Sequence, residues 1–252
     1  MACAVQEGPV VDQKIFVRGD YNSLGEDAPK AFPIVIAGDD QPPITKGSGR
    51  IELAEWLTRP DHPLTARVIT NRIWQWHFGE GIVHTPDNFG KMGEAPTHPE
   101  LLDTLAIQFV ENGWSIKKLH RQTLLSNTYR MSSSPTDAAV QADRENRLFS
   151  RFPRRRLTVE EVRDGLLAID GSLDTTMGGT LQSGFGTDGE NSNDRLSISP
   201  ETSKRRLVYL PLRRANLPSL LNLFDFGDAT TSSGKRTVTT VAPQALFMMN
   251  SS

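Results

Sequence analysis

Cysteine is almost absent from this sequence. The 252 residues contain one cysteine, Cys3, whereas a disulfide within the chain or a Cys-x-x-Cys-His haem attachment site needs two. Secreted proteins need not carry disulfides, so this scarcity does not identify the compartment. The sequence also lacks an apolar run long enough to span a bilayer. Its first residues do not show the basic and then apolar pattern of a signal peptide.

The chain also lacks a large excess of charge of either sign. Its formal net charge is −2, from 28 Lys and Arg and 30 Asp and Glu. An overall field that would attract DNA or RNA is therefore missing, although arginine is concentrated at residues 151–156 and 205–214. A hydrophobic content of 37% is enough for a packed core and is unlike a disordered segment. We expect a globular protein with no nucleic-acid partner and no membrane span.

The stretch from Pro63 to Phe78 predicts the helix around which the rest of the chain is organised. Proline fits the first turn of a helix, and neither Gly nor Pro follows until Gly79. Apolar residues fall on two faces of this helix, so we expect it to be buried between other elements. Its polar side chains then need partners, which are either the scaffold or a ligand. These side chains are Arg67, Asn71, Arg72 and Gln75.

Residues 1–49 and 50–252 differ in character. The first range is rich in Gly, Pro and Asp, and two short apolar runs at 15–17 and 34–36 predict strands in an irregular lead-in. The second range is predicted to be a helical domain. A Ser-rich break before Pro135 marks a possible internal boundary near residues 132–136.

Helical signals recur through residues 50–252. Thr97-x-x-Glu100 and Thr158-x-x-Glu161 have the spacing of capping boxes, and Ser115 is a third candidate cap. Besides the central helix, helices are expected near 51–57, 98–112, 115–126, 158–170 and 217–224 and from Pro243 onward. A strand is expected at 207–210 and a surface loop at 178–200. We therefore predict a mainly α fold, a single irregular helical domain around a central buried helix with a few short β-strands.

A long Gly-rich connection, residues 79–96, follows the central helix and exceeds the usual loop length. Side chains in and beside it carry the imidazole and carboxylate groups that a metal site or an acid–base pair needs at neutral pH. These candidates are His77, His84, Asp87 and His98. They could converge if the loop folds back over the end of the central helix. No His-Glu-x-x-His motif supports this, and the alternative is that the histidines pack or end helices.

Three residues of the central helix are candidate ligand-binding residues. Arg67 and Arg72 could hold an anionic group bidentately, with Asn71 between them. The alternative is that the arginines pair with acids such as Asp103 or Glu111, or cap carbonyl groups. The nature of any metal or ligand stays open at this point.

Several short stretches match one known family in order and spacing and together cover most of residues 5–250. They are Phe16–Gly19, Gly47–Arg50 with Leu53-Ala54, Asn71–Gln75 with His77–Gly79, Thr97–Leu102, Ser126 with Thr128–Arg130, Glu145–Leu148, Arg154–Leu157 and Val241–Leu246. With these stretches the chain resembles the planctomycete domain of unknown function 1553, a C-terminal module of large secreted proteins. Trp76 stands where many members have histidine, which counts against a metal site built on residues 76 and 77.

The resemblance implies which domains accompany this one and where the protein is located, more than it implies a reaction. Proteins of this family usually carry cytochrome-c-like and companion unknown-function domains upstream, and they are thought to be exported and linked to the handling of complex polysaccharides. This chain is therefore expected to hold no cofactor, with haem only on upstream domains that it lacks. An extracytoplasmic location and truncation at both ends relative to the family are also expected.

Two functions from different classes remain open. The first is a docking or scaffold module whose partners are the upstream domains and whose setting is polysaccharide handling. The alternative is a metal-dependent or acid–base hydrolase acting on carbohydrate through His77, His84, Asp87 and His98. Whether the chain is an enzyme is not decided by its sequence.

Overall fold

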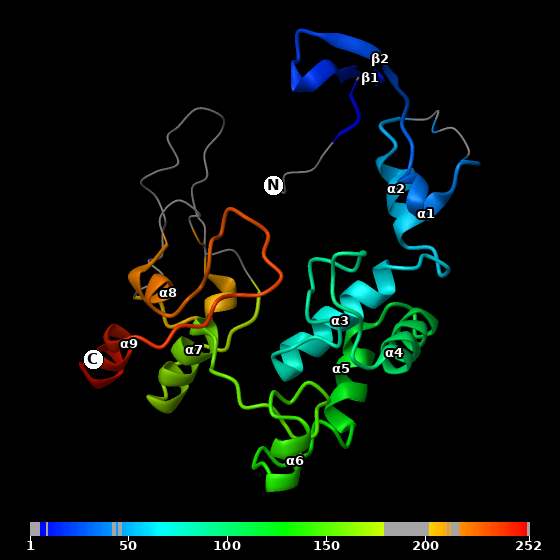
Figure 1. The fold of residues 1–252 in the computed structure, drawn as a ribbon. Coiled ribbons are helices and arrows are strands. Elements are labelled where there is room, and N and C mark those ends of the chain that lie inside the picture. The colour runs from blue at the N-terminus through cyan, green and yellow to red at the C-terminus, as the bar shows by residue number, and fades with distance from the viewer. Residues whose placement is uncertain are drawn as a thin grey trace. The chain divides into compact units, whose positions relative to one another are not determined.

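The computed structural model describes residues 6–8, 10–41, 44, 47–178, 202–210, 212 and 217–250. These residues contain nine α-helices, two short 3-10 helices and one two-stranded sheet, so the predicted mainly α class is confirmed. The chain divides into two compact units, Met1–His84 with Phe89–Met131 and Thr85–Asn88 with Ser132–Ser252. Each is described by itself (Figure 1). The surface loop expected at 178–200 lies, apart from Gly178, outside the described residues.

The first unit begins with a β-hairpin. Strand β1 (Gln13–Phe16) pairs with β2 (Leu24–Ala28) in antiparallel register, with Phe16 opposite Leu24. The 3-10 helix η1 (Val17–Gly19) follows β1, and Arg18 within it has a left-handed backbone with φ of 56°. A strand at 15–17 was expected, and β1 accounts for most of it.

The strand expected at 34–36 is wrong. Residues Ile34–Ala37 form the short helix α1. Its turn is closed because the amides of Ile36 and Ala37 both donate to the carbonyl of Pro33. A four-residue apolar run has no periodicity that separates a strand from a helical turn.

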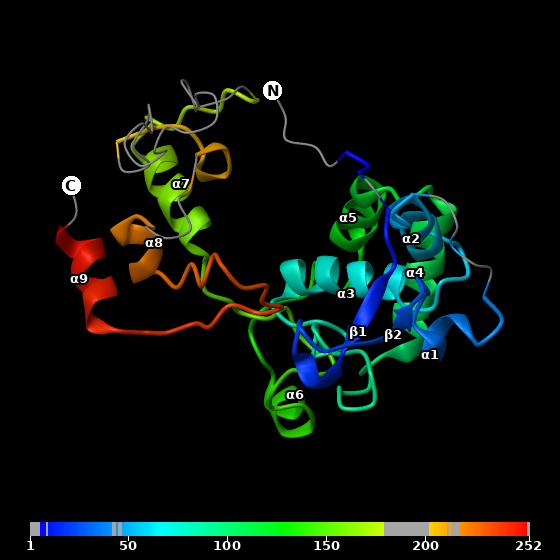
Figure 2. The same cartoon turned by 90° about the horizontal axis from the view of Figure 1, so that it is seen from above.

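Four further helices build the rest of the first unit: α2 (Arg50–Leu57), α3 (Thr65–Phe78), α4 (Pro99–Glu111) and α5 (Ile116–Leu125). Figure 2 shows α3 alongside α4 and α5, and these three helices contact one another. The central helix is confirmed, and Ile73, Trp74 and Phe78 are among its buried residues. Trp76, although apolar, is 60% exposed.

The start of α4 differs from the capping box expected at Thr97. Pro99 is the first helical residue and His98 is the N-cap, without a side-chain cap. The amide and the hydroxyl of Thr97 both donate to the carbonyl of Ile82, at 2.9 and 3.2 Å. Proline at the first position has no amide that needs a cap, so Thr97 is free to hold the preceding loop. The cap expected at the start of α5 is confirmed, with Ser115 Oγ accepting from Lys118 N.

Asn71 anchors the loop that follows the central helix. It is fully buried, its Nδ2 donates to the carbonyl of Val83 at 3.0 Å, and its Oδ1 accepts from Val83 N at 2.8 Å. The side-chain amide thereby pairs with the backbone of Val83 as a neighbouring strand would. Gly81 packs so closely that a Cβ there would lie 2.5 Å from the oxygen of Val83 and 2.6 Å from Asn71 Nδ2.

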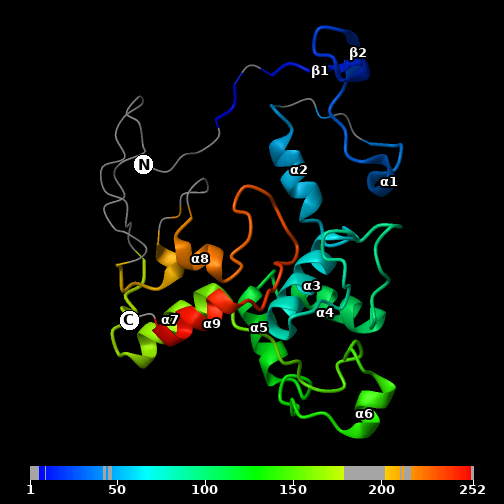
Figure 3. The same ribbon diagram turned by 60° about the vertical axis from the view of Figure 1, so that its left-hand side comes forward.

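The second unit contains α6 (Asp137–Ala142), α7 (Val159–Ile169), the 3-10 helix η2 (Leu207–Tyr209), α8 (Ser219–Leu223) and α9 (Ala242–Asn250). Figure 3 shows α7, α8 and α9 gathered together. Its core lies between α7, η2 and α8, and its buried members are Val159, Leu207, Leu210, Leu221 and Phe224. Phe247 of α9 packs against this core.

The strand expected at 207–210 is wrong, because these residues form η2. The amide of Leu207 donates to Asp164 Oδ1 at 3.0 Å, and the amide of Leu210 donates to the carbonyl of Leu207. The capping box at the start of α7 is confirmed, with reciprocal bonds between Thr158 and Glu161. Within the described residues, no helix is both long and apolar enough to cross a membrane.

Gly81→Ala and Asn71→Ala should each destabilise the first unit. The added methyl of Gly81→Ala has no space, at a cost of about 1–3 kcal/mol. Asn71→Ala leaves the backbone groups of Val83 buried without partners, at a cost of about 2–4 kcal/mol. Chemical denaturation followed by tryptophan fluorescence measures this unit, because all four tryptophans lie in it. The control is the exposed Asn127→Ala, expected within about 0.5 kcal/mol of the parent; equal effects at 71 and 127 would refute the anchor.

Glu161 should make the second unit less stable in acid. Its ion pair with Arg155 lowers the pKa of the carboxyl from 4.5 to about 2. The stabilisation is therefore complete above pH 4.5 and is lost as the pH falls toward 2. Because the side chain is 40% exposed, solvent screening limits the effect to about 1 kcal/mol or less. Glu161→Gln keeps the cap but not the charge. The free energy of unfolding of this variant, measured by circular dichroism, should therefore change less between pH 5 and pH 2 than that of the parent chain. An unchanged pH profile would contradict this assignment.

Candidate functional site

The four candidate catalytic residues lie in different surroundings. His77 is in the last turn of α3, His84 is in the following loop and His98 is the N-cap of α4. Asp87 belongs to the second unit. Among the described residues, no three His, Cys, Asp or Glu side chains are grouped so that they could hold a metal ion. The four residues are therefore not gathered in one cluster, and a catalytic role for each stays a prediction.

His77 meets a histidine that is distant in the sequence. Its Nε2 lies 2.8 Å from Nδ1 of His120 on α5. The edge of the Tyr129 ring completes the cluster, with its centroid 5.7 Å from that of His77. All three rings are partly buried. One of the two facing nitrogens must carry the proton that the other accepts, so the pair is able to share a proton.

His84 is the second histidine with a notable environment. Its Nδ1 lies 3.9 Å from Oε2 of Glu94, and its side chain is 13% exposed. Its Nε2 is buried and has no hydrogen-bond partner in the part of the chain that the structure describes. An imidazole beside a carboxylate is the arrangement that orients a general base. His98, by contrast, contacts the hydroxyl of its neighbour Thr97 through Nδ1, at 3.0 Å.

The candidate ligand-binding residues of the central helix are used within the fold. Arg67 binds Asp103, with 2.6 Å between Nε and Oδ1, and also the carbonyl of Pro63. The hydrogen bond from Arg67 lowers the pKa of the Asp103 carboxyl. The amide of Asn71 is occupied by the backbone of Val83, and Arg72 is partly buried and has partners of its own.

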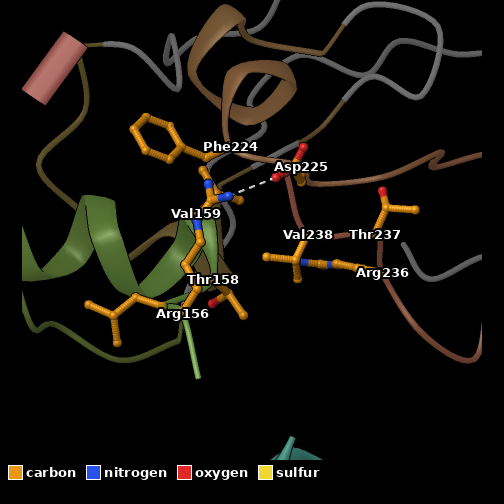
Figure 4. Close-up of a pocket in the computed structure, with 9 residues that line it drawn as sticks. Arg156, Thr158, Val159, Phe224, Asp225, Arg236, Thr237 and Val238 are labelled. Atoms are coloured by element: carbon orange, nitrogen blue, oxygen red, sulfur yellow. Dashed lines mark hydrogen bonds and ion pairs between the residues drawn. The ribbon is translucent and has the colours of Figure 1, made fainter. Parts of the chain in front are cut away.

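The second unit contains a pocket that the sequence did not indicate. It has an empty volume of about 300 Å³, open to solvent. In Figure 4, the residues at the start of α7 enter from one side and residues 236–238 from the other. Its lining consists of Arg156, Leu157, Thr158, Val159, Phe224, Asp225, Arg236, Thr237 and Val238.

An ion pair forms one wall of this pocket. Arg156 Nη1 donates to Asp225 Oδ2 at 3.0 Å and also to the carbonyl of Thr239. The guanidinium carbon lies 5.5 Å from the centroid of the Phe224 ring. The other terminal nitrogen of Arg156, Nη2, is buried without a hydrogen-bond partner.

Asp225 joins three segments of the second unit. Besides Arg156, its carboxylate accepts from the amide and the hydroxyl of Thr239, at 2.9 and 2.8 Å. Gln244 of α9 continues the network, donating to Thr239 Oγ1 and to the carbonyl of Leu223. Burial by itself would raise the pKa of Asp225, but the donors of Thr239 and Arg156 outweigh it and the pKa lies below its ordinary value.

Three further contacts hold the segment that carries Arg236. Its Nη1 donates to Glu160 Oε2 at 2.9 Å, and its guanidinium lies over the ring of Phe226. The carboxylate of Asp87 accepts from Gly234 N at 2.6 Å. A Cβ at 234 would clash with that carboxylate, so a larger residue there would displace the Asp87 side chain. In this structure Asp87 holds a loop of its own chain.

Comparison with known proteins yields one match. The model of the PSD1 family, described as protein of unknown function (DUF1553), matches residues 49–252. The curated proteins and the solved structures that were compared include none similar to the chain. The matched range includes the pocket, the His77–His120 pair and the His84–Glu94 pair.

Asp225→Asn should destabilise the second unit. Asparagine tolerates the left-handed φ of 59° at this position. The variant therefore tests the loss of the charge without adding backbone strain. We expect a cost of about 2 kcal/mol, because the bonds from Arg156 and Thr239 go to a charged acceptor. Denaturation followed by circular dichroism measures it. Asp228→Asn, an exposed carboxylate that also accepts from threonines, is the control. Equal losses would show that Asp225 has no special role.

Proposed function

We propose that this chain, which belongs to the DUF1553 family of proteins of unknown function, is a docking module that binds other protein domains through exposed apolar side chains. The observation that carries the proposal is the β-hairpin of the first unit. Phe16 and Leu24 face each other across its strands, yet they are 46% and 57% exposed. Ile15, the neighbour of Phe16 in β1, is 53% exposed.

Apolar exposure on the hairpin supports a partner that covers it. Ile15, Phe16 and Leu24 are all exposed, and they lie at the register shift between Lys14 and Phe16. A two-stranded hairpin is marginally stable by itself in water. Apolar side chains gathered on a surface are typical of interaction sites. Tyr21 and Val17, between the strands, add to this surface at 74% and 44% exposure.

The partners in this proposal come from the family resemblance. We propose that the module docks cytochrome-c-like and companion unknown-function domains of longer family members, outside the cytoplasm and in the handling of complex polysaccharides. In this proposal the docking module itself carries no haem or other cofactor. The charge of the hairpin region is compatible with a basic partner surface, because Asp12, Asp20, Glu26 and Asp27 outnumber Lys14 and Arg18.

A second candidate function rests on His84 and Glu94. The 3.9 Å approach of the two side chains and the unpartnered Nε2 of His84 are the features that an acid–base hydrolase of carbohydrate would use. In this candidate His77 and His98 assist as ligands or acid–base groups. The docking module remains the better supported of the two, since His77, His84 and His98 have separate partners in His120, Glu94 and Thr97.

The docking proposal predicts that the hairpin face controls binding. The probe is a purified cytochrome-c-like domain from a longer DUF1553 protein, titrated into this chain by calorimetry. Phe16→Thr combined with Leu24→Thr should weaken binding at least tenfold, because it removes apolar area that the complex buries. The matched control is Ile107→Gln with Ile116→Gln, which changes two apolar side chains of similar exposure on α4 and α5 and should leave binding unchanged.

Two outcomes would contradict docking by the hairpin. One is equal binding by the hairpin variant and the parent chain. The other comes from thermal melts of the chain, first with a chelator and then with added zinc, calcium or manganese. It is a midpoint that rises by several degrees when the metal is added, and that does not rise in His84→Ala or His98→Ala. A ligand bound only by the folded state raises the midpoint, so that result would favour the hydrolase.

A further inference from the structure

The pocket beside α7 has more hydrogen-bond donors than its own acceptors use. Nη2 of Arg156 is buried, and none of the described residues forms a hydrogen bond with it. Arg236 uses Nη1 for Glu160, which leaves Nε and Nη2 of a guanidinium that is 41% exposed. Thr237 adds a hydroxyl to the lining. A buried guanidinium nitrogen without an acceptor is costly, so the pocket is suited to a group that brings acceptors.

The carboxylates near the pocket are already engaged. Asp225 accepts from Arg156 and twice from Thr239. Glu160 accepts from Arg236 but does not line the pocket. Each guanidinium group of the lining is therefore paired with one carboxylate, Arg156 with Asp225 and Arg236 with Glu160. What the pocket offers an anion is the N–H donors that these pairs leave unused.

The other walls of the pocket are apolar. Leu157, Val159, Phe224 and Val238 do not compete for the hydrogen bonds of an anion. Thr158, the N-cap of α7, also lines the pocket, so the helix begins at its edge. Arginine presents its donors as a planar fork that matches the oxygens of carboxylate, sulfate and phosphate groups.

We propose that this pocket binds a small oxyanion group, held by Arg156 and Arg236 with Thr237 as a further donor. The ligand class is a carboxylate, sulfate or phosphate group, free or carried by a larger molecule. The site is separate from the docking hairpin and from the histidines of the first unit, so it stands whether or not the docking proposal holds.

The test is calorimetric titration of the full chain with sodium sulfate, sodium phosphate and sodium acetate, each at constant ionic strength set with chloride. At least one anion should bind. Arg236→Gln should weaken that binding at least tenfold, and Thr237→Val should weaken it measurably. The three salts distinguish a tetrahedral from a planar oxyanion. Arg156→Gln is not the primary variant, because it also removes the ion pair with Asp225.

Arg155→Gln is the matched control. Arg155 is 36% exposed and paired with Glu161, as Arg236 is 41% exposed and paired with Glu160, but Arg155 does not line the pocket. This variant should bind the anion as the parent does. Absence of binding by all three anions, or equal weakening in Arg155→Gln and Arg236→Gln, would overturn the proposal.

Discussion

The structure depends on hydrogen bonds to the polar groups that its central elements bury. In the first unit these bonds are made by Asn71, which has no exposed surface. Its side-chain amide forms hydrogen bonds with both the N–H and the carbonyl of Val83. Leaving those groups unpaired would be more costly than a lost surface contact. The loop after α3 is therefore held by a side chain of the helix it leaves, and the long connection to α4 begins from a fixed point.

In the second unit a charged side chain, the carboxylate of Asp225, provides the hydrogen bonds that buried polar groups need. Asp225 collects donors from Arg156 and Thr239, and Gln244 connects Thr239 to α8 and α9. Two stretches on which the family resemblance rests, Arg154–Leu157 and Val241–Leu246, thus belong to one network: Arg156 binds the carboxylate directly, and Gln244 is joined to it through Thr239. In both units these polar side chains serve the scaffold. This arrangement agrees with a module whose function lies on its surface.

Long periodic segments were predictable from the sequence, whereas short ones were not. The apolar periodicity of α3 and α4 spans several turns, and the capping box at Thr158 is read within four residues. The runs at 34–36 and 207–210 are too short for periodicity, and they became a helical turn and a 3-10 helix. Thr97 had the spacing of a cap, but Pro99 moved the helix start by one residue.

The candidate sites were less predictable because they depend on distant pairs. His77 and His120 are 43 positions apart, and Asp87 and Gly234 are 147 positions apart. No local pattern reports such contacts. Asp103 was among the acids expected for Arg67, since opposite charges on two predicted helices can pair, but Arg156 and Asp225 lie in segments without a periodic signal.

Hydrogen–deuterium exchange of the chain, alone and with a cytochrome-c-like domain of a longer family member, tests the docking claim most directly. Amides in a covered hairpin exchange more slowly than in an exposed one. Docking predicts slower exchange within residues 13–28 when the partner is added, with little change around His84 and Glu94. Unchanged exchange in the hairpin while the partner binds elsewhere would contradict the account.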